Sequence, residues 1–418
     1  MGSETTDIAI VGGGVGGLAA AAFLRAEGFE PVVYEQARAL TEIGAGLVIA
    51  PNAGKQLRRL GVLDRLLTHA VRLDIGWEFR RWQDGSVLSS EDLKTACREL
   101  YGEHTYTAHR ADLLDALKSA VPESSVRLGM RSTSVRFDGN QAVVTFENGD
   151  EIRPELVIGA DGVHSVVRRA VAGGIPARES GFCAYRALIP ASRAPEFATR
   201  AAQTLWVGPD HHLVHYPVSG GDYVNVVAFA PTSDAIVESW TATASIEELV
   251  AEFRGWDPRL VGLIEASETP GRWALLDREP LEVWNRGTAT LLGDAAHPMY
   301  PFFAQGAAQA IEDGAVLALC LAENRSDITA AMQAYENVRR PRTTRMQQMS
   351  HGRSLVNHLP DGMEQQARDD AYSARDPLMD NGWIYGYDPL EAVATQRYAT
   401  SGVRRNKPST SVERSLPA

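Results

Sequence analysis

The sequence has 418 residues, more than one ordinary hydrophobic core accommodates, and this length predicts two closely packed domains. Its net charge of −12 leaves no general basic surface, so neither nucleic acid nor a membrane is an expected partner. Its three cysteines are widely spaced, which supports neither a disulfide framework nor a metal site and makes the cytoplasm the expected location.

The first predicted unit is a strand, a glycine turn, a helix and a second strand over residues 7–35. Gly12 permits the sharp turn, Gly14 lets the backbone approach a pyrophosphate, and Gly17 lets the helix pack on the strand. Glu35 ends the second strand, where its carboxylate can accept hydrogen bonds from ribose hydroxyls. This unit predicts a dinucleotide site without a 2′-phosphate.

The chain then alternates between helical and β patterns. Leucines three to four residues apart predict helices over residues 56–68 and 112–120. Residues 126–158 have a β pattern, and the pair Asn148 and Gly149 predicts a hairpin turn. These segments complete the first α/β part of the chain.

The pattern changes to antiparallel β over residues 176–284. This block carries no phosphate-binding glycine turn and is therefore predicted to cover the substrate. Residues 305–357 are predicted to be helical, and the dense basic cluster at 339–342 is interpreted as a solvated helix end. The polar tail, 401–418, is predicted to be disordered.

Two further turns follow apolar strand-like runs. Asp161 follows the run ELVIGA, and Asp294 follows TATLLG. A strand that ends in a tight turn before a helix is a place where phosphate or ribose oxygens bind. Three such turns indicate one long cofactor that is contacted at three places, and FAD fits best. Because there is no second GxGxxG, a nicotinamide reductant is expected to dock only transiently.

These motifs together resemble the class A flavoprotein aromatic hydroxylases, which have the p-hydroxybenzoate hydroxylase fold. Asp161 opens a DGxxSxxR segment, Asp294 lies in a GD segment whose aspartate binds the ribitol, and Arg110 lies in an HRxxL segment whose arginine holds FAD. The resemblance covers nearly the whole chain and is greatest to salicylate, 3-hydroxybenzoate and 6-hydroxynicotinate hydroxylases. The expected cofactor-binding residues are Gly12, Gly14, Gly17, Glu35, Arg110, Asp161, Asp294, Pro298, Gln305, Gly306 and Ala307.

The resemblance implies an α/β fold with a discontinuous Rossmann-type FAD-binding domain, an inserted antiparallel-sheet substrate domain and C-terminal helices. The two domains are expected to be interleaved along the chain. The expected bounds are 1–75, 102–175 and 285–357 for the FAD-binding domain, 76–101 and 176–284 for the substrate domain, and 358–400 for the C-terminal helical region.

The substrate site is expected on a strand within residues 208–217. In the relatives, a histidine and a tyrosine four residues later line the substrate ring and help to ionise its phenol; here they are His212 and Tyr216, the expected catalytic residues. Strand geometry places both on one face but about 13 Å apart, so they are expected to meet a substrate from different sides unless a bulge brings them together. Without the resemblance, these histidines are interpreted as ordinary strand residues that face solvent. Tyr300 and Phe302 complete the predicted site and favour a larger or more apolar phenol or hydroxypyridine over a small benzoate or nicotinate.

The implied activity is that of an FAD-dependent monooxygenase. NADH or NADPH reduces non-covalently bound FAD, dioxygen adds to give a C4a-hydroperoxyflavin, and one oxygen atom is transferred to an electron-rich aromatic or heteroaromatic ring. The helix that begins after Gln305 is expected to direct its positive N-terminus at the flavin. Glu312 and Asp313 within that helix are expected to be solvated or to act as caps.

Other functions stay open at this point. The same fold can support epoxidation of an alkene or the oxidative decarboxylation of a salicylate, and a flavin-bound chain without turnover could serve as a binding module. The sequence does not identify the aromatic substrate, does not distinguish NADH from NADPH, and leaves open whether the chain forms a homo-oligomer.

Overall fold

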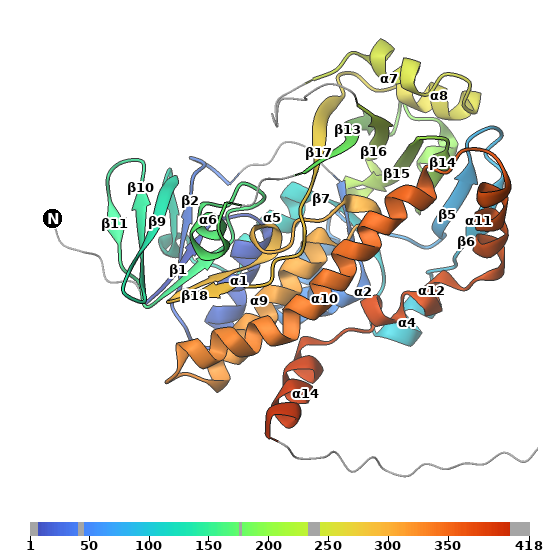
Figure 1. Cartoon of the computed structure of the whole chain (residues 1–418). Coiled ribbons are helices and arrows are strands. Elements are labelled where there is room, and N and C mark those ends of the chain that lie inside the picture. Colours follow the sequence, from blue (N-terminus) through green and yellow to red (C-terminus); the bar gives the residue numbers. More distant parts are fainter. Residues whose placement is uncertain (1–6, 41–45, 175–177, 233–242, 402–418) are drawn as a thin grey trace, which may run out of the picture.

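The computed structural model describes residues 7–40, 46–174, 178–232 and 243–401. Two large sheets lie at opposite ends of the molecule, and the long helices α9 (Gly306–Glu323) and α10 (Ile328–Asn357) lie along them (Figure 1). One sheet is mostly parallel and the other mostly antiparallel. The predicted α/β class, with a Rossmann-type part and an antiparallel part, is confirmed.

The six-stranded sheet positions the three glycine and aspartate turns. Its neighbours β19, β12 and β1 run parallel to one another, so their carboxyl ends meet at one edge. Helix α1 (Val15–Ala26) connects β1 to the parallel β2 and packs against α9. The strands, in spatial order, are β18 (Asn285–Arg286), β19 (Ala289–Leu291), β12 (Leu156–Gly159), β1 (Ile8–Val11), β2 (Val32–Glu35) and β8 (Val126–Leu128).

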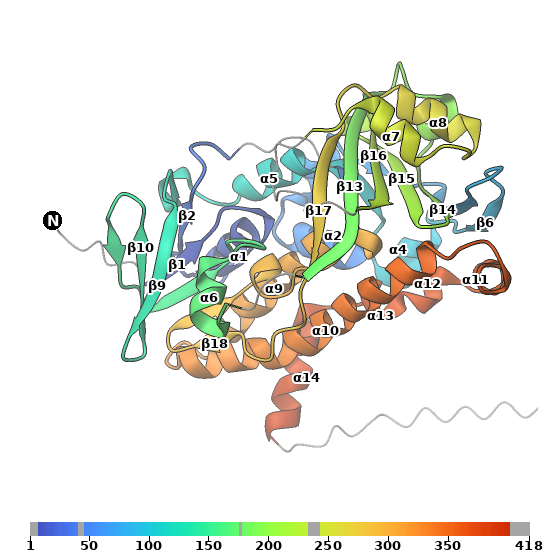
Figure 2. The same ribbon diagram turned by 45° about the horizontal axis from the view of Figure 1, so that its top comes forward.

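The seven-stranded sheet packs against helices on its outer face and against a segment of the chain on its inner face. Helices α7 (Ile246–Glu252) and α8 (Pro258–Glu265) cover the outer face, as Figure 2 shows. The inner face packs against the segment that precedes α9. The strands, in spatial order, are β17 (Gly271–Asp277), β13 (Arg178–Pro190), β16 (Tyr223–Pro231), β15 (His211–Val218), β14 (Ala202–Gly208), β5 (Gly76–Arg81) and β6 (Val87–Ser90).

Two three-stranded sheets complete the β structure. The predicted hairpin is present, and Gly149 in its turn has φ +87°, a left-handed conformation that favours glycine. The sheet with this hairpin contains β11 (Glu151–Ile152), β10 (Gln141–Phe146) and β9 (Ser132–Asp138), and the other contains β3 (Gly46–Ile49), β7 (Tyr106–His109) and β4 (Val71–Arg72).

The helical predictions hold with local differences. Residues 56–68 form parts of two helices, α2 (Pro51–Arg59) and α3 (Leu63–Leu67), because Gly61 between them has φ +73°. Helix α5 (Arg110–Lys118) starts earlier than predicted because the side chain of His109 caps it. The other helices are α4 (Ala96–Tyr101), α6 (Val166–Ala172), α11 (Met363–Ala374), α12 (Pro377–Asp380), α13 (Gly382–Tyr385) and α14 (Pro389–Ser401).

The end of the chain differs from its prediction at one residue. Ser401, assigned from the sequence to the disordered tail, is the last residue of α14, and the rest of that tail (402–418) lies outside the described residues. Within the four described ranges, no helix is both long enough and apolar enough to cross a membrane.

Candidate active site

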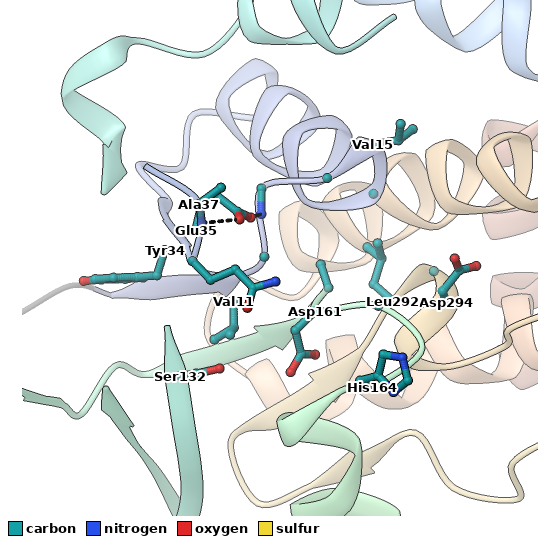
Figure 3. Close-up of a pocket in the computed structure, with 18 of the residues that line it drawn as sticks. Val11, Val15, Tyr34, Glu35, Ala37, Ser132, Asp161, His164, Leu292 and Asp294 are labelled. Carbon is teal, nitrogen blue, oxygen red and sulfur yellow. Dashed lines mark hydrogen bonds between the residues drawn. The ribbon is translucent and has the colours of Figure 1, made fainter. Parts of the chain in front are cut away.

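A cavity of about 690 Å³ opens where β1, β12 and β19 end (Figure 3). It extends from the end of β2, past the glycine turn, to the start of α9. Its volume and its length across three adjacent strands suit an extended ligand. Of the residues predicted to bind the cofactor, those that line this cavity are Gly12, Gly14, Glu35, Arg110, Asp161, Asp294, Gly306 and Ala307.

The glycines of the first turn have separate roles. Gly12 has φ +107°, and a Cβ atom there would lie 2.3 Å from the carbonyl oxygen of Ala160. At Gly17 a Cβ atom would lie 1.9 Å from the carbonyl oxygen of Gly12, so this glycine allows α1 to pack behind the turn. A Cβ atom at Gly14 would meet no atom of the described residues within 4 Å, which leaves space for a pyrophosphate beside the N-terminus of α1.

Glu35 and Asp294 lie at opposite sides of the cavity, with the glycine turn between them (Figure 3). The Glu35 carboxylate is held in place because its two oxygens accept hydrogen bonds from the backbone N–H groups of Gly13 (2.6 Å) and Ala37 (2.8 Å). Each carboxylate oxygen has a second lone pair that can accept a ribose hydroxyl. Asp294 is exposed to the cavity, as a ribitol ligand requires.

Asp161 lies in the second of the three glycine and aspartate turns, the one that follows β12, and caps helix α6. Its carboxylate accepts hydrogen bonds from the backbone N–H groups of Val166 (2.7 Å) and Val167 (3.2 Å) and from the hydroxyl of Ser165. Burial raises the pKa of Asp161, although these donors oppose that shift. Its direct structural role is therefore to hold the second turn at the cavity wall.

Arg168 joins this second turn to the third turn, which follows β19 and contains Asp294. Its guanidinium donates to the carbonyl oxygens of Asp294 and Ala295, both at 3.4 Å, and to that of Val163. Burial, and then the nearby charge of Arg278, lowers the pKa of Arg168 to about 10, so it stays charged at neutral pH. The arginine of the DGxxSxxR segment thus fixes the position of the GD segment.

Two predicted cofactor residues, Pro298 and Gln305, are buried outside the cavity wall and shape the segment that leads to α9. The carbonyl oxygen of Pro298 accepts a hydrogen bond from the side chain of Gln347 (2.9 Å). The side-chain oxygen of Gln305 accepts hydrogen bonds from Asn52 (2.9 Å) and Gln309 (3.2 Å). Helix α9 begins at the next residue and directs its N-terminus into the cavity.

The interpretation of Glu312, Asp313 and Arg339 as solvated groups is wrong, and the 339–342 cluster lies inside α10 instead of at a helix end, with only Arg340 of its arginines half-exposed. Glu312, Asp313 and Arg339 are fully buried, because α9 lies between α1, α2 and α10 and has no solvated face at this level. Arg339 donates to Glu312 and to Asp313 at 2.6 Å each, and Arg342 donates to Glu312 at 2.8 Å. Burial would raise the pKa of Asp313, but His297 and Arg339 lower it to about 2.

This buried charge cluster also contacts the residues beside the cavity. One Asp313 oxygen accepts hydrogen bonds from the backbone N–H of Gly293 (2.9 Å) and from His297 (2.6 Å). Asn52 donates both to Glu312 (2.6 Å) and to Gln305. The cluster therefore fixes the third turn and the start of α9.

The predicted substrate residues His212, Tyr300 and Phe302 form one aromatic group on the inner face of the seven-stranded sheet. The ring centroids of His212 and Phe302 lie 5.0 Å apart, those of Tyr300 and Phe302 5.3 Å, and Phe229 stacks on His212 at 4.2 Å. His212 is only 1% exposed, so it is not a strand residue that faces solvent. Burial, and then the neighbouring His358 and His211, lowers the pKa of His212 well below its ordinary value.

Tyr216 lies on the same face but in a separate group. The pairing of β15 with β16 is regular from His212 to Tyr216, so no bulge brings the two side chains together. Tyr216 packs with Val48 and Ala304 instead. The separation expected from strand geometry is therefore present.

Two further polar groups on this inner face were not assigned a role from the sequence. The guanidinium of Arg186 lies 5.0 Å from the ring centroid of Trp273, and its Nε atom is buried without a hydrogen-bond partner among the described residues. His358, at the end of α10, contacts His212. Arg186 lies within the β segment predicted over residues 176–284, whereas no local pattern marks His358.

Comparison with known proteins identifies the family. The FAD binding domain family matches residues 5–350. The chain is 39% identical to a 3-amino-4-hydroxybenzoate 2-monooxygenase of Streptomyces platensis, over 91% of this chain and 96% of that protein. The chain belongs to the FAD-dependent aromatic hydroxylases. Another member, a 6-hydroxynicotinate 3-monooxygenase of Pseudomonas fluorescens, is 36% identical over 92% of this chain and 96% of its own length.

Solved structures agree with this assignment. HpxO of Klebsiella pneumoniae, in a complex with FAD and uric acid, is 28% identical and superposes with a TM-score of 0.79 over 93% of this chain and 96% of its own. A salicylate hydroxylase substrate complex, 24% identical, has the same fold, with a TM-score of 0.78 over 94% of this chain and 98% of that one. This FAD-dependent aromatic hydroxylase is thus an aromatic or heteroaromatic monooxygenase with FAD as its cofactor and NAD(P)H as its co-substrate.

Proposed function

We propose that this hydroxylase inserts one oxygen atom into a hydroxylated ring that is held against His212, Tyr300 and Phe302. The observation that carries the proposal is the continuity of one segment: Tyr300 and Phe302 contact the His212 group, and Gly306, shortly after them, lines the FAD cavity. A ring held there would lie beside the segment that leads from the inner face of the sheet to the FAD cavity. Bound FAD supplies the reduction of dioxygen and the transfer of an oxygen atom.

The residues that line the cavity each have a defined task in the proposal. The Gly12 to Gly14 turn holds the pyrophosphate, Glu35 the adenosine ribose and Asp294 the ribitol, which agrees with their places around the cavity. Arg110, at the start of α5, is proposed to hold FAD from another wall of that cavity. The N-terminus of α9, which lines the cavity, would stabilise negative charge on a bound flavin.

The substrate residues orient the ring and favour its ionised form. We propose that His212 takes the proton of the phenol and that Tyr216 forms a hydrogen bond with the ring from a second side. His212 is buried among aromatic side chains, an arrangement that excludes water from the reacting ring. The charge on a bound phenolate would raise the pKa of a neighbouring imidazole and offset the effect of burial.

The substrate class has two candidates. The relatives act on rings that carry a hydroxyl and a carboxylate, by their names, and Arg186 is a cation on the inner face that could pair with a carboxylate. The aromatic residues Tyr300 and Phe302 favour a more apolar phenol or hydroxypyridine. A panel with 3-amino-4-hydroxybenzoate, apolar phenols and hydroxypyridines separates the two, because the true substrate accelerates NAD(P)H oxidation and yields a hydroxylated product.

We also propose that the enzyme acts in the cytoplasm. Cys97, Cys183 and Cys320 are all buried free thiols, which supports a reducing cytoplasm. The domain bounds given from the sequence, and a homo-oligomeric state, are likewise proposed. Size-exclusion chromatography with light scattering measures the oligomeric state directly.

Asp294→Ala should weaken FAD binding about 10- to 100-fold, because a charge-assisted hydrogen bond contributes about 1.5–3 kcal/mol. The measurement is the Kd for FAD of the apoprotein, by quenching of flavin fluorescence. Asp64→Ala is the matched control, because Asp64 is an exposed aspartate of α3 outside the cavity wall. An unchanged Kd in Asp294→Ala would contradict the placement of the ribitol.

His212→Ala should leave FAD binding intact and lower the rate of product formation about tenfold or more, because the group that assists ionisation of the phenol is lost. The control is His215→Ala. His215 is also buried on β15, but it lies on the opposite face, where its Nε2 atom is 3.3 Å from the indole nitrogen of Trp206. A wild-type rate in His212→Ala would exclude the proposed role.

A further inference from the structure

His212 has a direct polar partner inside the aromatic group. Its Nδ1 atom lies 2.6 Å from the Nε2 atom of His358, which is the residue directly after α10. The backbone carbonyl of His358 accepts a hydrogen bond from the N–H of Asp210 (3.1 Å). The end of α10 is therefore docked onto the start of β15, 146 residues away along the chain from one histidine to the other.

The two imidazoles are enclosed by aromatic rings. Phe182 stacks on His358 at 4.5 Å between ring centroids, and Phe229 stacks on His212 at 4.2 Å. Phe302 meets the two histidine rings edge-on, at 5.0 and 6.2 Å. A contact of 2.6 Å between two ring nitrogens requires one proton between them, since two lone pairs would repel each other.

No other polar group in the described structure competes for this contact. The Nδ1 atom of His358 is buried and has no hydrogen-bond partner there, and no carboxylate is hydrogen-bonded to either ring within the described residues. His211, whose charge also acts on both rings, bonds to Glu252 instead (3.1 Å). Burial lowers the pKa of both rings of the pair, that of His358 to about 3, so the pair is neutral at neutral pH.

We propose that His358 is a positioning residue that fixes the tautomer of His212. We place the shared proton on His212 Nδ1, with His358 Nε2 as its acceptor. In that tautomer the Nε2 atom of His212 carries a lone pair and can take the proton of a phenol. In that step the O–H bond of the phenol breaks, an N–H bond forms on His212 Nε2, and the resulting positive charge is shared across the 2.6 Å contact. The proposal rests on the function proposed above.

The test compares three changes at the two positions. His358→Gln keeps a polar group that can accept the Nδ1 proton, His358→Phe removes it while keeping an aromatic ring, and His212→Ala removes the base. The probe is 3-amino-4-hydroxybenzoate labelled with ¹³C at the hydroxyl-bearing carbon and bound to the FAD-loaded enzyme. The ¹³C chemical shift measures the fraction of bound probe that is phenolate.

We expect His358→Phe to lower the ratio of bound phenolate to phenol about tenfold, as His212→Ala does, and His358→Gln to restore it to within about threefold of wild type. The double variant, His212→Ala with His358→Phe, should lose no more than His212→Ala alone, because the two residues act as one unit. His215→Phe, on the outer face, is the control for the loss of a buried histidine and should keep the wild-type ratio.

Three outcomes overturn the inference or its basis. A wild-type ratio in His358→Phe while His212→Ala loses phenolate would overturn the role of His358 alone. A wild-type ratio in His212→Ala, or a probe that does not bind, would instead contradict the proposed function. Equal losses in His358→Gln and His358→Phe, together with a lowered melting temperature in both, would show that His358 only holds α10 against the sheet.

Discussion

Replacing Arg339 by leucine is expected to lower the free energy of unfolding by about 3–5 kcal/mol, the cost of removing one partner from a buried charge cluster. Arg339 is fully buried and donates to Glu312 and Asp313 at 2.6 Å each. Without it, His297 still contacts Asp313 and Arg342 still contacts Glu312. The remaining positive charge is nevertheless too small to offset the cost of burying two carboxylates.

Urea unfolding of wild type and Arg339→Leu, both without FAD, measures this loss. Arg340→Leu is the matched control on the next residue of α10. Arg340 is half-exposed and pairs with Glu336 at 3.3 Å, so its loss should cost at most about 1 kcal/mol. If Arg339→Leu costs no more than Arg340→Leu, the buried cluster does not stabilise the protein as argued here.

Gly17→Ala is expected to have the second largest effect, a loss of about 1–3 kcal/mol or more in stability together with loss of FAD binding. The new methyl group would lie 1.9 Å from the carbonyl oxygen of Gly12. Helix α1 is buried along most of its length, between β1 and α9, so it cannot move away without opening the core. The glycine turn would be displaced with it.

Gly14→Ala separates stability from binding. Within the part of the chain that the structure describes, a methyl group at Gly14 meets no atom within 4 Å and projects into open space at the cavity wall. We expect the apoprotein of this variant to unfold like wild type, while its Kd for FAD rises at least about tenfold through overlap with the pyrophosphate. Wild-type stability and wild-type FAD affinity in Gly17→Ala would contradict the packing role assigned to that glycine.

The cofactor half of the site could be predicted because its signals are local. Gly12, Gly14 and Asp294 each lie in a turn directly after a strand, and parallel strands bring such turns to one edge of the sheet. The separation of His212 from Tyr216 followed in the same way from the repeat of a strand. The structure adds how Gly17 differs from Gly14: one packs and the other leaves space.

The buried polar groups could not be predicted in this way. Glu312 and Asp313 were expected to be solvated because acidic residues usually are, although the alanine-rich helix around them is apolar on all sides, a sign of burial. Arg339 finds them only when α10 packs on α9. His358 lies far along the chain from His212, and a single histidine after a helix carries no local signal.

The most direct test of the account is oxygen labelling during turnover. Purified FAD-loaded enzyme is supplied with NAD(P)H, ¹⁸O₂ and each member of the panel of hydroxybenzoates, phenols and hydroxypyridines. The account predicts that at least one ring compound accelerates NAD(P)H oxidation and leaves as a product with one ¹⁸O atom on the ring, and that His212→Ala forms that product about tenfold more slowly or less. Oxidation of NAD(P)H that yields only hydrogen peroxide with every compound, and no labelled product, would contradict it.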